Sequence, residues 1–61
     1  MRLYIKKETD KAYLLYALNF AERWVPKKAV KLTPNSEKLG IFGISYEMTI
    51  EKWALNLNNN R

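Results

Sequence analysis

The sequence predicts a small, mainly β protein with one short C-terminal helix, and two observations support this class. Residues 42–50 alternate strictly, with large apolar side chains at even positions and small or polar ones at odd positions. This period of two is typical of a strand with one face toward a core and one toward water. Pro26 ends an earlier apolar run, because proline has no N–H for a β ladder and fixes φ near about −65°. We therefore expect a small antiparallel sheet.

The composition argues against an enzyme. The 61 residues are enough for a single domain, 1–61, and so short a chain buries only about 60% of the surface that its unfolded form exposes. The sequence has no cysteine and no histidine, so the usual residues of disulfides, zinc sites and catalytic triads are missing. The carboxylates are scattered, and no pair has a spacing that suggests acid–base catalysis. We expect no catalysis and no cofactor.

The charge favours an anionic partner. Lys and Arg total 11 against 6 Asp and Glu, which gives a net charge of +5. Such an excess on a small body favours binding to anions, although a purely solvated surface is the competing interpretation. The longest apolar run, 12–18, is far shorter than the roughly 20 residues that span a bilayer. The N-terminus lacks an apolar signal-peptide segment. We expect a cytoplasmic protein without membrane contact.

The first half of the chain is predicted to form three strands. Residues 1–7 alternate and end in a polar turn at 8–10. Residues 11–18 fit a strand buried on both faces, which turns near Asn19, placed in the left-handed region, and returns to Val25 as a hairpin. Trp24 is expected in the core, because so small a chain needs its indoles inside.

A helix over 11–24 is the alternative for this segment, and it would make the fold α+β. The tyrosines, the stop at Pro26 and the lack of charge before Glu22 favour the hairpin. The turn, however, lacks the Asn-Gly or Asp-Gly pair that a two-residue hairpin prefers. Asp10 could cap the helix. One helical face would carry Leu14, Leu18, Ala21 and Val25.

After Pro26 we expect one 3₁₀-type turn over 27–30 and then an extended segment at 30–32. The cluster of turn residues at 33–36 predicts a loop that Gly40 ends. Beyond the strand at 42–50, Thr49 can cap a short helix whose Trp53 packs back on the sheet. Residues 57–61 are expected to fray.

Basic residues gather around the turn after Pro26 and beside the first turn. In the hairpin topology they would form a continuous stripe along one edge. Such a stripe can follow a phosphate backbone while an exposed ring stacks on a base. Nucleic acid, or an acidic or nucleic-acid-binding host protein, is the expected partner. The predicted contact residues are Lys6, Lys7, Lys11, Arg23, Lys27, Lys28 and Lys31.

An inhibitor or adaptor that binds one host or defence protein is the alternative function. Its predicted anchors are Phe20, which has little core to reach at the tip of the expected hairpin, and Tyr13 in the second strand. The exposed edges of so small a sheet can also pair with a second copy, which makes a homodimer a third possibility.

Three segments resemble a family of small bacteriophage proteins: residues 11–15, residues 24–30 (Trp-Val-Pro-Lys-Lys-Ala-Val) and residues 50–54. The family pattern has serine at the position of Lys28 and proline at that of Glu51. The resemblance implies an accessory protein in the host cytoplasm and supplies no mechanism. Residues 24–32 also resemble the end of an SH3 barrel, where a proline-led 3₁₀ turn joins two strands. This second likeness makes an SH3-like barrel another form of the sheet and implies no peptide specificity.

Overall fold

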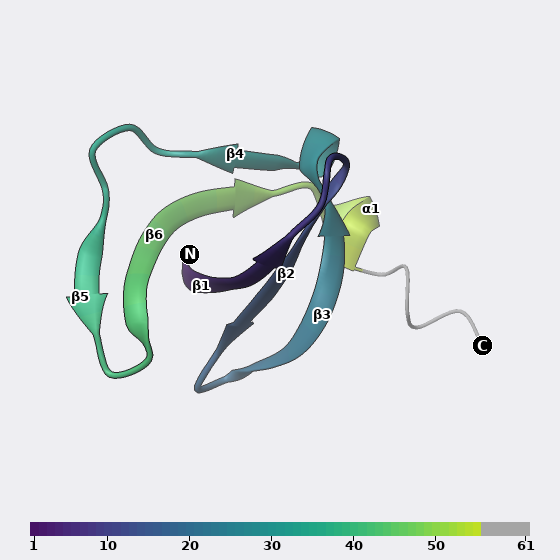
Figure 1. Ribbon diagram of the computed structural model, residues 1–61. Helices are drawn as coiled ribbons and strands as arrows, with labels where there is room; N and C mark the ends of the chain where they lie inside the picture. The colour runs from purple at the N-terminus through teal and green to yellow at the C-terminus, as the bar shows by residue number, and fades with distance from the viewer. Residues whose placement is uncertain (56–61) are drawn as a thin grey trace.

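The computed structural model describes residues 1–55 of the chain, and these residues form six strands, one 3₁₀ helix and one short α-helix (Figure 1). The mainly β class is confirmed. The alternative helix over 11–24 is wrong, because this segment forms an antiparallel hairpin. The elements are β1 (Arg2–Glu8), β2 (Ala12–Ala17), β3 (Phe20–Pro26), η1 (Lys27–Ala29), β4 (Val30–Leu32), β5 (Lys38–Gly40), β6 (Gly43–Ile50) and α1 (Lys52–Leu55).

The strands form one antiparallel sheet in the order β3-β2-β1-β6-β4, and β5 pairs with the first part of β6. β6 is the central strand, since β1 pairs along one of its edges and β5 and β4 pair with successive parts of the other. It curves strongly (Figure 1). Within residues 1–55, β3 and β4 do not pair, so the sheet is open and does not close into the SH3-like barrel that was one expected form.

The core is formed by side chains from the meander β1–β3, from the second half of β6 and from η1 and α1. Leu15, Val25 and Met48 are the largest side chains that are fully buried. Leu15 and Val25 come from the neighbouring strands β2 and β3, whereas Met48 comes from β6, which β1 separates from β2 in the sheet order. The curvature of the sheet lets these side chains pack together. The core cluster consists of Leu3, Leu15, Val25, Ala29, Met48, Ile50 and Ala54.

The two indoles lie outside this core, contrary to the prediction. Val25 is fully buried, so the alternation of side chains along β3 places Trp24 on the opposite face, where it is 46% exposed. In α1 the buried residue is the small Ala54, which joins the core cluster, while Trp53 remains 45% exposed. One turn of helix has room for one inward side chain, and Ala54 occupies that place.

The alternation predicted for 42–50 describes only the second half of β6. Met48 and Ile50 are buried as expected, but Phe42 and Ile44 are exposed and Ser45 is buried. Ser45 is enclosed because β1 pairs on one side of it and β5 on the other. Its hydroxyl accepts a hydrogen bond from Arg2 and donates one to the Lys38 carbonyl. β5 itself falls in the segment where a loop was expected.

The turns differ from the prediction in two details. Among residues 1–55, Asn35 is the only non-glycine residue with a positive φ, at 58°, so Asn19 does not adopt the left-handed conformation. Thr49 lies within β6 and therefore does not cap α1. Residues 57–61, which were expected to fray, lie outside the described part of the chain. In that described part, neither helix has the length and apolar character needed to cross a membrane.

Candidate binding surface around the 3₁₀ helix

The end of the β2–β3 hairpin positions the lysines around η1. Pro26 pairs with Ala12 at the end of β3, and the Lys27 N–H donates a hydrogen bond of 2.8 Å to the Lys11 carbonyl. Pro26 keeps an extended backbone, with φ −60° and ψ 138°, and η1 then turns the chain into β4. The predicted succession of strand, 3₁₀ turn and extended segment is confirmed. It brings Lys11 beside lysines from a separate segment of the chain.

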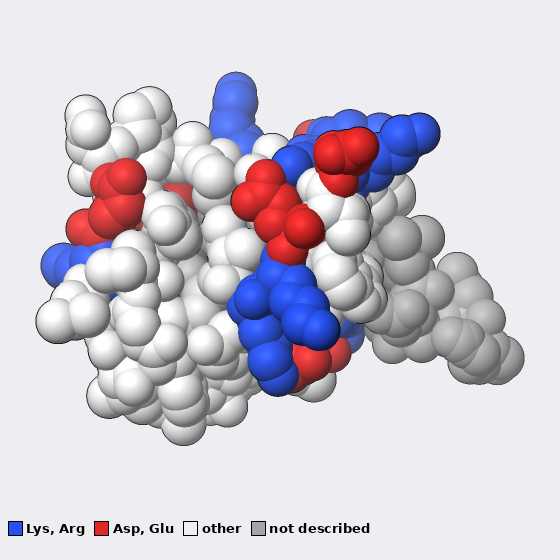
Figure 2. Space-filling view, in the orientation of Figure 1, with Lys and Arg blue, Asp and Glu red and all other residues white. Residues whose placement is uncertain are grey.

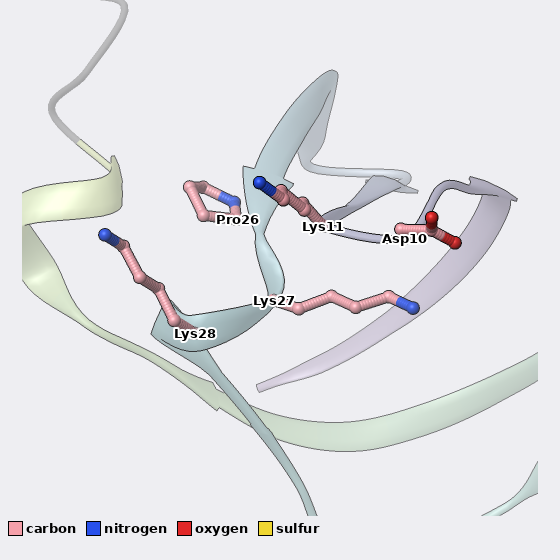
Figure 3. A pocket seen from close by; sticks show the side chains of 5 residues that line it. All are labelled: Asp10, Lys11, Pro26, Lys27 and Lys28. Carbon is pink, nitrogen blue, oxygen red and sulfur yellow. The ribbon is translucent and has the colours of Figure 1, made fainter.

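A recess of about 600 Å³ lies between these segments and is lined by Asp10, Lys11, Pro26, Lys27 and Lys28. Figure 3 shows Lys11 and Lys28 on the side of the recess where the Pro26 ring lies, while Lys27 extends the other way, toward β1. Two ammonium groups therefore flank an apolar ring. This combination can accept an anion together with an apolar group attached to it.

Lys27 forms an ion pair with an acidic neighbour, Glu8. Its Nζ lies 2.6 Å from Oε2 of Glu8 and 5.1 Å from the centroid of the Tyr13 ring. The hydrogen bond with Glu8 raises the pKa of Lys27 above its ordinary value of 10.5. An anionic ligand would have to compete with Glu8 for this ammonium group, so Lys27 contributes less to binding than the sequence predicts.

We expect Lys27 to titrate above pH 10.5 in the folded protein, and Glu8→Gln to lower its pKa toward that value. A pKa raised by folding means that the ion pair stabilises the fold below pH 10.5 and that this contribution is lost as the pH rises through the folded-state pKa. NMR titration of the Lys27 side-chain carbons checks this. Asp10→Asn is the matched control and should lower the pKa less. An unchanged midpoint in Glu8→Gln would contradict the ion pair.

Lys28 lies beside the exposed indole of α1. Its Nζ is 5.8 Å from the centroid of the Trp53 ring, within the range of a cation–π contact. Lys28 and Lys31 also line a second hollow, of about 400 Å³, together with the acidic Glu51. Within residues 1–55, no carboxylate forms an ion pair with Lys11, Lys28 or Lys31. These three ammonium groups are therefore available to a ligand.

Trp24 extends this region along β3. It precedes Pro26 by two residues, so both side chains lie on the same face of the strand. Each of two residues that line the recess thus has a half-exposed indole associated with it: Pro26 shares a strand face with Trp24, and Lys28 contacts Trp53. We call this region the lysine–tryptophan surface, and it consists of Lys11, Trp24, Pro26, Lys28, Lys31 and Trp53.

The other predicted basic residues do not join this surface in a continuous stripe. Lys6 pairs with Glu22 at 3.1 Å across β2. The Arg23 guanidinium donates a hydrogen bond of 2.6 Å to the Leu55 carbonyl and so ties β3 to α1. Lys7 is exposed on β1. On the face that Figure 2 shows, acidic side chains lie between the basic groups. The predicted stripe is wrong for this reason.

The two predicted protein anchors are partly buried. Phe20 and Tyr13 both pack against the core cluster. The Arg23 guanidinium lies 5.4 Å from the centroid of the Phe20 ring, and Lys27 covers Tyr13. The exposed residues of this turn are Leu18 and Asn19. The expectation that Phe20 is exposed at the hairpin tip is wrong, because Phe20 is already the first residue of β3.

Sequence reasoning missed Trp53 as a surface residue. The available signal is the adjacent Ala54, whose small side chain suits a close contact between a single helical turn and the sheet. In the described part of the chain, no group of three acidic side chains could hold a metal ion. The surface thus combines ammonium groups with aromatic rings.

A scan against models of known protein families found no match, and neither did searches of characterised proteins and of solved structures.

Proposed function

We propose that this chain is a small phage-type accessory protein that binds single-stranded nucleic acid through the lysine–tryptophan surface, without catalysis, in the host cytoplasm. The observation that carries the proposal is the Lys28 ammonium group 5.8 Å from the centre of a half-exposed Trp53 ring. A phosphate and its base need such a cation and such a ring side by side. The phage-type character rests on the sequence resemblance alone.

A single strand suits this surface better than a duplex does. The bases of a duplex cover one another's faces, whereas an unpaired base can stack on an aromatic side chain. Stacking of this kind is worth about 1–3 kcal/mol per base. Trp24 and Trp53 offer two half-exposed rings, and Lys11 and Lys28, which line the recess beside Pro26, offer ammonium groups for the phosphates.

We expect the affinity for a labelled single-stranded oligonucleotide to fall about 20-fold between about 50 and about 200 mM salt. This follows if Lys11, Lys28 and Lys31 each neutralise one phosphate, since the logarithm of the affinity falls by about 0.7 per contact for each unit of log salt. Fluorescence anisotropy measures the affinity directly. No binding at the lower salt concentration would contradict the proposal.

Tryptophan fluorescence tests the stacking part of the proposal. Bound bases should quench the indoles, and Trp24→Phe and Trp53→Phe each leave a single indole whose quenching can be followed. A duplex of the same sequence is the control, and it should quench less at equal saturation. Steep salt dependence without quenching in either variant would exclude stacking and leave only phosphate contacts.

The alternative, an inhibitor or adaptor of an acidic or nucleic-acid-binding host protein, is supported by the same pair of residues. Trp is enriched among the residues that dominate protein interfaces, and Trp53 is a half-exposed indole beside the Lys28 ammonium group. The two functions differ in stoichiometry and competition. A protein target should bind at a defined ratio, and an oligonucleotide should not displace it unless the target itself binds nucleic acid.

A further inference from the structure

The described residues place charge and apolar surface at opposite ends of the molecule. η1 and the β1–β2 turn lie at one end of the sheet, and the β2–β3 and β5–β6 turns lie at the other (Figure 1). The lysine–tryptophan surface belongs to the first end. In Figure 2 the end that carries the β5–β6 turn is largely free of charged side chains.

The β5–β6 hairpin forms the apolar end. Its exposed fractions are 81% for Leu39, 74% for Ile41 and 46% each for Phe42 and Ile44. Residues 39–46 include no charged side chain. Two-residue turns normally carry Asn, Asp or Gly, yet here Ile41 and Phe42 occupy the tip between the paired Gly40 and Gly43. Contiguous exposed apolar surface of this kind marks an interaction site.

This hairpin is held firmly against the sheet. The Phe42 ring lies 5.3 Å from the Tyr4 ring and 5.4 Å from the Tyr16 ring, between centroids. The Tyr16 hydroxyl also donates a hydrogen bond of 3.3 Å to the Phe42 carbonyl. The Tyr4 hydroxyl occupies the space where a side chain at position 40 would start, so any residue other than glycine there would displace the Tyr4 ring. The apolar end is therefore a preformed surface.

β5 also has an open edge. It pairs with β6 on one side, and no strand of residues 1–55 pairs with its other side. The far edge of the sheet, β3, is protected differently, because it carries Glu22 and Arg23 and the Arg23 side chain holds α1 beside it. β5 carries one charged side chain, Lys38, at its start. The exposed apolar residues that follow leave the rest of its open edge as a template for another strand.

We propose that the β5–β6 hairpin is the interface of a homodimer, in which the β5 strands of two copies pair antiparallel about a two-fold axis. The distribution of charge over the molecule favours a second copy of this chain as the partner that binds the β5–β6 hairpin. Each copy carries +5, but residues 39–46 contribute none of it, so two copies that meet there keep their lysine–tryptophan surfaces apart, where repulsion is weakest. A two-fold contact also satisfies both open edges at once and brings Leu39 of one copy near Leu39 of the other.

The dimer does not depend on nucleic-acid binding, and its test uses the protein alone. We expect sedimentation velocity to give a mass that rises with concentration from 7.2 kDa to twice that value. Ile41→Asp should hold the protein at the monomer mass, and Ile41→Val should still dimerise. Trp53→Asp is the matched control at the other end and should dimerise. A monomer at every concentration overturns the proposal and leaves the hairpin as a surface for a different protein.

Cross-linking keeps the proposal testable if Ile41→Asp fails to fold. The chain has no cysteine of its own. Leu39→Cys therefore places a single thiol close to the two-fold axis, and oxidation should convert most of this variant to a disulfide-linked dimer. Lys52→Cys, at the opposite end, should form little disulfide-linked dimer under the same conditions, although it should still dimerise without the link. Equal yields of linked dimer from the two variants would overturn the arrangement.

Discussion

Reversing the charges of Lys11 and Lys28 together should lower the affinity for single-stranded nucleic acid about 100-fold at low salt. Hydrogen bonds to charged groups contribute about 1.5–3 kcal/mol, which corresponds to about tenfold or more for each lost contact. These two ammonium groups flank the recess beside Pro26 and form no ion pair with a carboxylate of residues 1–55. The salt slope should also become shallower by about 1.4, for two lost contacts.

Lys7→Glu is the control for this loss. It changes the net charge as much as Lys28→Glu does, and Lys7 is exposed on β1 outside the lysine–tryptophan surface. We expect Lys28→Glu to cost about tenfold in affinity and Lys7→Glu much less, as contacts with charged groups act at short range. Equal losses would show that binding follows overall charge, and the assignment of the surface would then be wrong.

Leu15→Ala should remove most of the stability of the fold. Leu15 is fully buried in β2, the strand between β1 and β3, and faces Ile5 across one ladder. Truncation of a buried leucine costs about 2–5 kcal/mol. A domain of this length has a total unfolding free energy of only about 3–9 kcal/mol, at 0.05–0.15 kcal/mol per residue. The variant should therefore be partly or wholly unfolded at room temperature.

Urea unfolding followed by circular dichroism measures this loss. Leu18→Ala is the matched control, because it removes the same atoms from an exposed side chain of the neighbouring turn. Exposed substitutions of this kind usually change the unfolding free energy by less than about 0.5 kcal/mol. If the two variants have the same unfolding midpoint, Leu15 is not at the centre of the core.

Local signals explain which elements were predictable. Pro26 lacks an N–H and has a fixed φ, and both properties act within a few residues, so the end of β3 and the position of η1 follow from the sequence. β1 and β2 were predictable for the same reason, because the alternation of β1 and the apolar run of β2 are also patterns among neighbouring residues. β5 escaped prediction because three residues, one of them Gly40, show no periodicity. Its strand character comes entirely from pairing with β6.

The position of each side chain relative to the core was less predictable. The alternation of side chains along a strand predicts that Trp24 and Val25 lie on opposite faces, but it does not predict which of them faces the core. The sheet order decides this, by placing β3 at an edge with Val25 over the core. Ser45 is buried for a similar reason, since β1 and β5 enclose it from two distant parts of the chain.

By itself, the sequence determined the mainly β class and the turn that carries Lys27 and Lys28, because these depend on neighbouring residues. It favoured the β2–β3 hairpin over a helix, and strand pairing in the folded protein decided between them. Only the tertiary structure decided which lysines remain available. Lys6 and Lys27 are neutralised by Glu22 and Glu8, which lie 16 and 19 residues away along the chain. Contacts over such separations depend on strand order and register. These also decide that two indoles and an apolar hairpin remain exposed at opposite ends of the sheet.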